Sequence, residues 1–176
     1  MLKKLLLSAI ACLIIQSAIA QNIKPYDLIQ LYKYSQVNES QYGKSIYQYL
    51  STVDTGWKLT AKPIVDESSS TVDYAYTKTG KSWFEPESHH LMVTRTYGPP
   101  VLNSVIYIFK DIELWKAYST QMVTMNATKL GITVQDGGTR TLYSLNGIGF
   151  ILVDFPPGIQ GPDRTFEVMI VTQNNH

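Results

Sequence analysis

The stretch "NATKLGITVQDGG", residues 126–138, marks the point where the chain changes from a helical pattern to a strand pattern. Before it, large apolar side chains recur at helical spacing, and Asp111 stands where a helix N-cap is favoured. The members of this stripe are Trp115, Tyr118, Met122 and Met125. We predict a helix over residues 110–131 that ends at Gly131, followed directly by a strand that begins in "ITVQ".

Runs rich in β-branched and aromatic residues predict three more strands, over residues 140–145, 149–155 and 165–173. The last two are apolar on both faces, so each needs cover on both sides. Either the two halves of the chain pack on each other and on the linking segments, or a partner protein supplies the cover. The segment "PPGIQGPD" between these strands is interpreted either as an ordinary connecting turn or as a rigid binding loop.

The first half of the chain repeats this order of elements. Residues 25–53 show helical spacing, which predicts two short helices in sequence or one helix with a break near Val37, and strand patterns follow over residues 57–62, 71–78, 89–97 and 103–109. The helix openings "DLIQLYKYS" and "DIELWKAYS" also share letters, which indicates an internal duplication. We therefore predict an α+β fold of two tandem helix-plus-four-stranded antiparallel sheet units, 21–110 and 111–176, with the helices packed on one sheet face. The units have either separate cores or one shared core in a single domain.

Residues 1–20 have the pattern of a secretory signal peptide: a basic "MLKK", an apolar "LLLSAIACLII" and a small-residue site that ends at Ala20. The sequence thus predicts a secreted or periplasmic protein of a bacterium. Lipidation of Cys12 is an alternative that the sequence leaves open.

Cleavage after Ala20 removes the only cysteine, so the mature chain has no disulfide, no thiol nucleophile and no thiolate metal site. It also removes Lys3 and Lys4, which leaves 13 basic against 14 acidic residues and a net charge of about −1. A chain without a basic run offers no electrostatic footprint for nucleic acid. No second apolar stretch is long enough to span a bilayer.

These features together resemble a group of uncharacterised exported proteins of Gram-negative bacteria that are built from tandem α-β4 units. The order of elements is similar to that of β-lactamase inhibitory protein, in which the sheets of two such units form one concave surface. No functional motif of that inhibitor can be matched to residues of this chain, and its disulfides have no counterpart here. The resemblance therefore implies a fold and no inhibitory activity.

The segment "WFEPESHH", residues 83–90, is the most suggestive for chemistry. Carboxylates and imidazoles suit zinc or copper, so a secreted hydrolase or metal-binding protein that uses residues 85–90, from Glu85 to His90, is the alternative function. However, His89 and His90 point to opposite faces if they begin a strand, and a solvated polar loop is the simpler interpretation. We predict no catalytic residue, no metal site and no cofactor.

Aromatic side chains are the other candidate for binding, because their rings offer contact area at low entropic cost. Trp57, Tyr74, Tyr76 and Tyr97 share one predicted strand face, where they either form core or grip a peptide or sugar. We name Trp57, Tyr74, Tyr76, Trp83, His89 and His90 as candidate binding residues. The sequence thus favours an exported, soluble, non-catalytic binding or protein-interaction module of the cell envelope. Its expected partner is a protein or peptide, or a second copy that docks through a sheet face.

Overall fold

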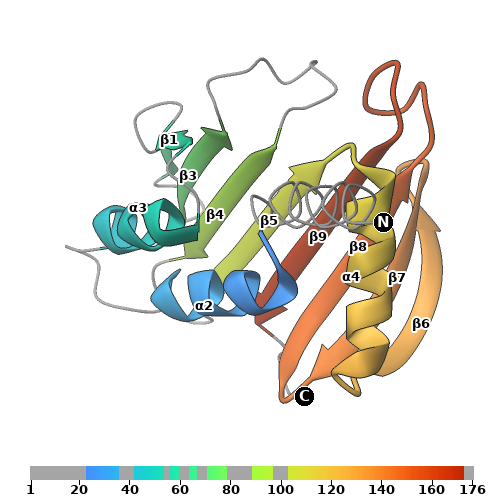
Figure 1. Ribbon diagram of the computed structural model, residues 1–176. Coiled ribbons are helices and arrows are strands. Elements are labelled where there is room, and N and C mark those ends of the chain that lie inside the picture. Colours follow the sequence, from blue (N-terminus) through green and yellow to red (C-terminus); the bar gives the residue numbers. More distant parts are fainter. Residues whose placement is uncertain are drawn as a thin grey trace, which may run out of the picture.

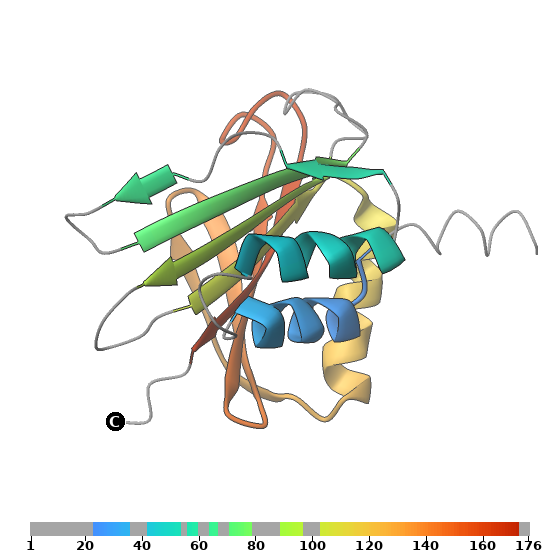
Figure 2. The same ribbon diagram turned by 90° about the vertical axis from the view of Figure 1, so that its left-hand side faces the viewer.

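The computed structural model describes residues 23–35, 42–53, 56–59, 64–66, 71–78, 89–96 and 103–172. Within them the fold is a mixed α+β arrangement of three helices and one antiparallel sheet. The helices are α2 (Pro25–Ser35), α3 (Tyr42–Val53) and α4 (Ile112–Thr124). Figure 1 shows the sheet running the width of the molecule, and Figure 2 shows α2 and α3 side by side. Among these residues, no helix has the length and apolar character needed to cross a membrane.

The nine described strands have the spatial order β1-β3-β4-β5-β9-β8-β7-β6, and β2 pairs with β3. Their bounds are β1 Trp57–Leu59, β2 Ile64–Asp66, β3 Thr71–Lys78, β4 His90–Thr96, β5 Asn103–Phe109, β6 Thr128–Gln135, β7 Gly138–Leu145, β8 Ile148–Phe155 and β9 Thr165–Thr172. The pairing of β5 with β9 joins the last strands of the two predicted halves. One continuous sheet therefore crosses the boundary predicted at residue 110.

The predicted end of the third helix at Gly131 is wrong. Helix α4 ends at Thr124, and Asn126 adopts a left-handed backbone conformation with φ 57°. Asparagine tolerates this conformation better than most residues, so the chain turns five residues before the glycine. Gly131 instead lies inside β6, beside an irregularity of register with β7 between Lys129 and Gly131. The predicted cap is confirmed, because the Asp111 side chain accepts hydrogen bonds from the backbone N–H groups of the next turn.

A single hydrophobic core joins the helices to the sheet. It contains Leu28 and Leu31 of α2, Ile46 and Leu50 of α3, and Tyr118 and Met122 of α4, packed on strand residues such as Tyr107, Phe150, Phe166 and Val168. The predicted stripe on α4 is confirmed: Tyr118 and Met122 are buried, and Trp115 stacks on Phe166 with ring centroids 4.9 Å apart. The Tyr118 hydroxyl donates to the backbone oxygen of Ile23 at 2.6 Å, which ties α4 to the residues before α2.

Candidate interaction face of the sheet

Alternate residues of the central strands point away from the core cluster, toward the opposite side of the sheet, which we call the open face. Five large apolar side chains meet there across five strands, and we call them the apolar row. In backbone register Met92 pairs with Ile106, Ile106 with Met169, Met169 with Ile151 and Ile151 with Leu142. All five are half-buried, and none belongs to the core or packs against it.

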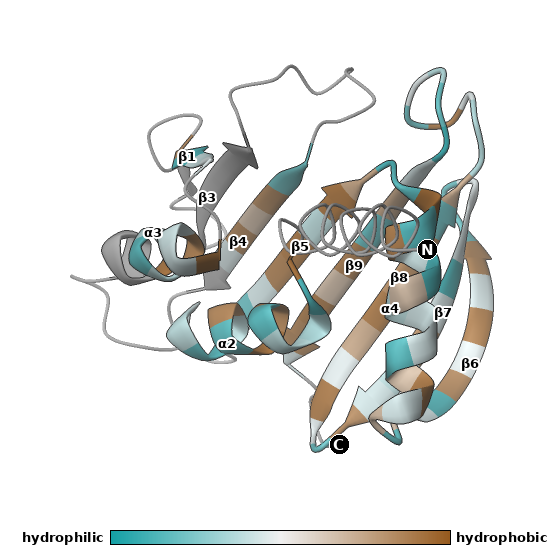
Figure 3. Cartoon of the chain, in the orientation of Figure 1, coloured by the Kyte–Doolittle hydropathy of each residue, from teal (hydrophilic) through white to brown (hydrophobic). Residues whose placement is uncertain are grey.

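The apolar row exists because β8 and β9 are apolar on both sides, as the sequence predicts. In β8, Phe150 and Leu152 enter the core, while Ile151 points the other way. In β9, Val168 and Ile170 enter the core, while Met169 points the other way. Figure 3 shows hydrophobic residues distributed along both strands. The core cluster therefore takes five of the eleven apolar residues in these strands, and Ile148 packs against it.

A border of mixed polarity runs along one side of the apolar row, and its apolar members Ile108 and Val153 are buried. The adjacent positions in register hold His90, Ile108, Glu167, Val153 and Arg140. Burial raises the pKa of the Glu167 carboxyl, whereas a hydrogen bond from Gln160 and the charge of Arg140 act in the opposite direction. The open face thus offers an apolar strip beside two ionisable groups of opposite sign.

The loop of residues 156–164 is fastened beside this border. Lys110 Nζ donates a hydrogen bond to Asp163 Oδ2 at 3.1 Å, and Arg164 Nε donates one to Asp154 Oδ1 at 2.7 Å. Gln160 Nε2 donates to Glu167 Oε1 at 3.1 Å, so the loop also contacts the open face itself. These contacts fix the position of the proline-rich loop, as a binding loop requires.

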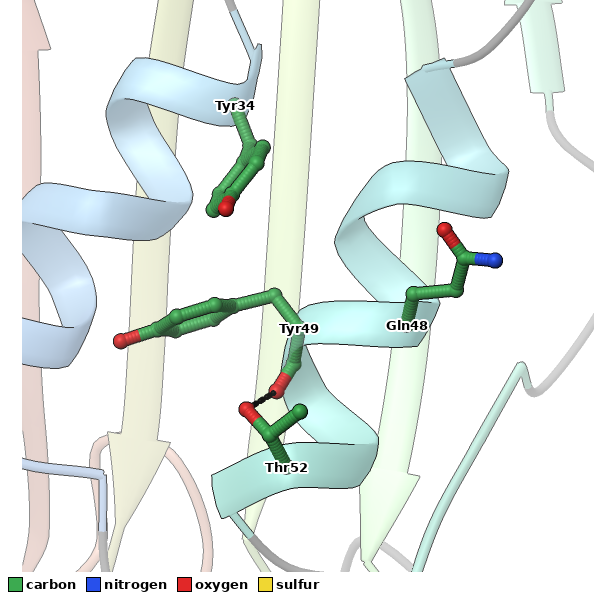
Figure 4. A pocket seen from close by; sticks show the side chains of 4 residues that line it. All are labelled: Tyr34, Gln48, Tyr49 and Thr52. Carbon is green, nitrogen blue, oxygen red and sulfur yellow. Dashed lines mark hydrogen bonds between the residues drawn. The ribbon is translucent and has the colours of Figure 1, made fainter.

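A small hollow lies between α2 and α3. Figure 4 shows its lining: Tyr34 from α2, and Gln48, Tyr49 and Thr52 from α3, around a cavity of about 200 Å³. The ring centroids of Tyr34 and Tyr49 are 5.3 Å apart, and the Tyr49 hydroxyl donates a hydrogen bond to Asp27 Oδ1 at 3.0 Å. Burial, and then this hydrogen bond, raise the pKa of Tyr49. The hollow is small compared with the several hundred Å³ of most ligand sites.

Only some of the predicted binding residues lie in the part of the chain that the structure describes. Trp57 is fully buried, with its ring 6.3 Å from that of Tyr107, so it is a core residue and offers no exposed stacking surface. The backbones of Tyr74 and Tyr76 lie in β3, in register with Val93 and Leu91. Trp83, like Tyr97, Glu85 and Glu87, lies outside the described residues.

His89 and His90 lie on opposite sides of the sheet. His89 shares a 2.6 Å hydrogen bond with the Tyr107 hydroxyl and stacks on Tyr107 and Phe109, which are core residues. His90 is in register with Ile108 on the other face, where burial, and then the charge of Lys110, lower its pKa to about 4. Among the described residues no group of three or more His, Cys, Asp or Glu side chains is arranged to hold a metal ion.

The comparisons with known proteins add no family to this description: no protein-family model, no curated protein and no solved structure matches the chain.

Proposed function

We propose that this chain is an exported, non-catalytic interaction protein of the bacterial envelope, and that it binds a protein partner through the open face. The observation that carries the proposal is the apolar row of Met92, Ile106, Met169, Ile151 and Leu142, which is half-buried on the side of the sheet away from the core. Contiguous apolar surface of this kind is typical of protein–protein contacts. Export rests on the signal-peptide pattern of residues 1–20.

The composition of the open face suits a protein surface better than a small ligand. Methionine side chains such as Met92 and Met169 are flexible and polarisable, and adapt to irregular partners. Glu167 and Arg140 at the border can select a partner of complementary charge, since such groups contribute specificity more than affinity. The surface is a face rather than an enclosed cavity, which favours a broad contact.

We also propose that the two halves are duplicated units whose helices cover one side of the sheet only. The strand order supports this, because it reads the first-half strands inward to β5 and the second-half strands outward from β9. The apolar row then belongs to both units: Met92 and Ile106 come from the first, and Met169, Ile151 and Leu142 from the second. Binding would therefore need the joined sheet, and neither half alone would present the surface.

Capture from an envelope fraction tests the proposal, with the exported protein as bait and Met169→Lys as the variant. We expect Met169→Lys to reduce capture of a specific protein at least about tenfold, because it places a charge in the middle of the contact. Val123→Lys is the matched control, since Val123 is 72% exposed on α4 and lies outside the open face. Thermal melting of both variants must first show that they fold.

Methionine oxidation then locates the contact. In the complex with the captured protein, peroxide should oxidise Met92 and Met169 more slowly than in the free protein, whereas Met125, which packs against the core, should react equally in both. Equal capture by Met169→Lys and wild type, or no protection of either methionine, would contradict the proposed function.

A further inference from the structure

A separate surface lies at the end of the sheet formed by β6. This strand is the last in the strand order, so its outer edge carries no neighbouring strand within the described chain. Three of its side chains are large, apolar and exposed: Leu130 at 56%, Ile132 at 57% and Val134 at 76%. The edge lies along one side of the molecule in Figure 1, and hydrophobic segments mark it in Figure 3.

Proteins usually protect such edges with charges, prolines or bulges, because an open edge recruits other strands. Here the protection is confined to one end, where Lys129 and the irregularity before Gly131 interrupt the strand. The regular part, Gly131 to Gln135, contains neither a charged residue nor a proline. An apolar, uncharged segment is thus available for pairing.

The backbone groups of this segment can be assigned a direction. The β6–β7 hairpin closes through Asp136 and Gly137, both with positive φ (54° and 79°), which is the two-residue turn that suits a twisted hairpin. The residues that flank such a turn, Gln135 and Gly138, form a hydrogen-bonded pair, and the pattern alternates from there. The N–H and C=O groups of Ile132 and Val134 are therefore directed outward.

We propose that β6 pairs with β6 of a second copy of the chain, antiparallel, with Thr133 of both copies at the two-fold axis. Ile132 then lies opposite Val134 of the second copy, and the same contact occurs twice. The outward-directed backbone groups of both residues can complete two hydrogen-bonded pairs. Thr133 meets its own counterpart on the other face, a favourable cross-strand pair.

Charge complementarity favours a second copy over an unrelated strand. Lys129 lies at one end of the segment and Asp136 just beyond the other, and the Asp136 side chain is 69% exposed although it pairs with Arg140. An antiparallel two-fold brings Lys129 beside Asp136 of the second copy at both ends. A parallel arrangement would instead place the two lysines together.

The expected dimer is reversible. A ladder of five residues buries less than the roughly 1,200–2,000 Å² of stable interfaces, so we expect a dissociation constant on the order of 100 µM. The two-fold axis is perpendicular to the sheet, because residues that pair have the same parity along the strand. The open faces of both copies then lie on the same side of a continuous sheet.

Sedimentation equilibrium between about 10 µM and 1 mM tests the dimer. We expect wild type to dimerise and Val134→Lys to raise the dissociation constant at least about tenfold, because two lysines would then enter the pairing strands. Val123→Lys, the same exchange at a similarly exposed position of α4, should dimerise as wild type does. A wild-type protein that stays monomeric at 1 mM, or equal loss in the two variants, would overturn the proposal.

Cysteine cross-linking tests the register. In a Cys12→Ser background, Thr133→Cys supplies the only cysteine, and Cα atoms of a non-hydrogen-bonded pair are about 4.5 Å apart, within disulfide range. Oxidation should therefore give a covalent dimer with Thr133→Cys and little with Thr120→Cys, whose position is exposed on α4. Equal cross-linking of the two would reject this pairing. Since Val134 lies outside the open face, Val134→Lys should still capture the envelope partner, so either proposal can fail alone.

Discussion

Gly138→Ala should destabilise the protein through steric overlap with two buried side chains. A Cβ atom at Gly138 would lie 2.7 Å from two ring carbons of Phe155 and 3.0 Å from a methyl group of Val153. Carbon atoms pack at about 3.5–4.0 Å, so the Phe155 ring would have to move by close to 1 Å. That ring is buried and cannot turn into solvent. Overpacking of this kind costs about 1–3 kcal/mol, or about 4–8 °C of melting temperature for a 2 kcal/mol loss.

Gly131→Ala is the matched control in the partner strand of the same hairpin, because a Cβ there has no atom within 4 Å. It should leave the urea midpoint unchanged or raise it slightly, since alanine reduces the entropy of the unfolded chain. Combining Gly138→Ala with Phe155→Leu should recover part of the loss in a double-mutant cycle. The packing argument is refuted if Gly138→Ala and Gly131→Ala have the same stability.

Three further predictions concern single groups. The pKa of His90 is about 4 in the folded protein and near 6.5 when unfolded, so the unfolded state binds more protons as pH falls from 6.5 to 4, and the free energy of unfolding decreases. In urea denaturation at several pH values, His90→Leu should reduce this decrease by about 1–3 kcal/mol. An equal pH dependence in the variant and the wild type would contradict the assignment. Tyr118→Phe removes the bond to Ile23 and leaves a buried carbonyl without it, so denaturation should show a loss of about 1–3 kcal/mol, and an unchanged midpoint would exclude that bond. The mass of the exported protein should correspond to a chain that begins at Gln21, whereas a lipid adduct at Cys12 would support the alternative.

Much of the fold could be predicted because local patterns and tertiary contacts agree. The strands at residues 71–78 and 103–109 have their predicted bounds, since alternation in each agrees with the sheet register. The end of α4 could not be predicted, because Leu130 also fits the helical pattern and Gly131 is a residue type that commonly ends a helix. Strand β2 was missed because three residues carry too little periodicity to detect.

The candidate site was predictable only in part. Two-sided apolar patterns in β8 and β9 indicate that a second face needs cover, and this inference uses sequence alone. Which side chains meet there depends on register between strands that lie far apart in the chain, such as Ile106 against Met169. Trp57 shows a second limit of the sequence pattern. An aromatic residue in an alternating strand has the same pattern whether its side chain lies in the core, as that of Trp57 does, or on the surface.

The strand order explains why an apolar row remains on the open face. Joining β5 to β9 places the most apolar strands of both halves at the centre of the sheet, where each has two faces to cover. The described helices contribute residues to the core cluster, and the loop of residues 156–164 contacts the open face through the hydrogen bond from Gln160 to Glu167. Met92, Ile106 and Met169 are each half-buried, so replacing one of them by threonine should cost less stability than the same exchange at a core position. The proposed contact with a partner protein would account for their apolar character.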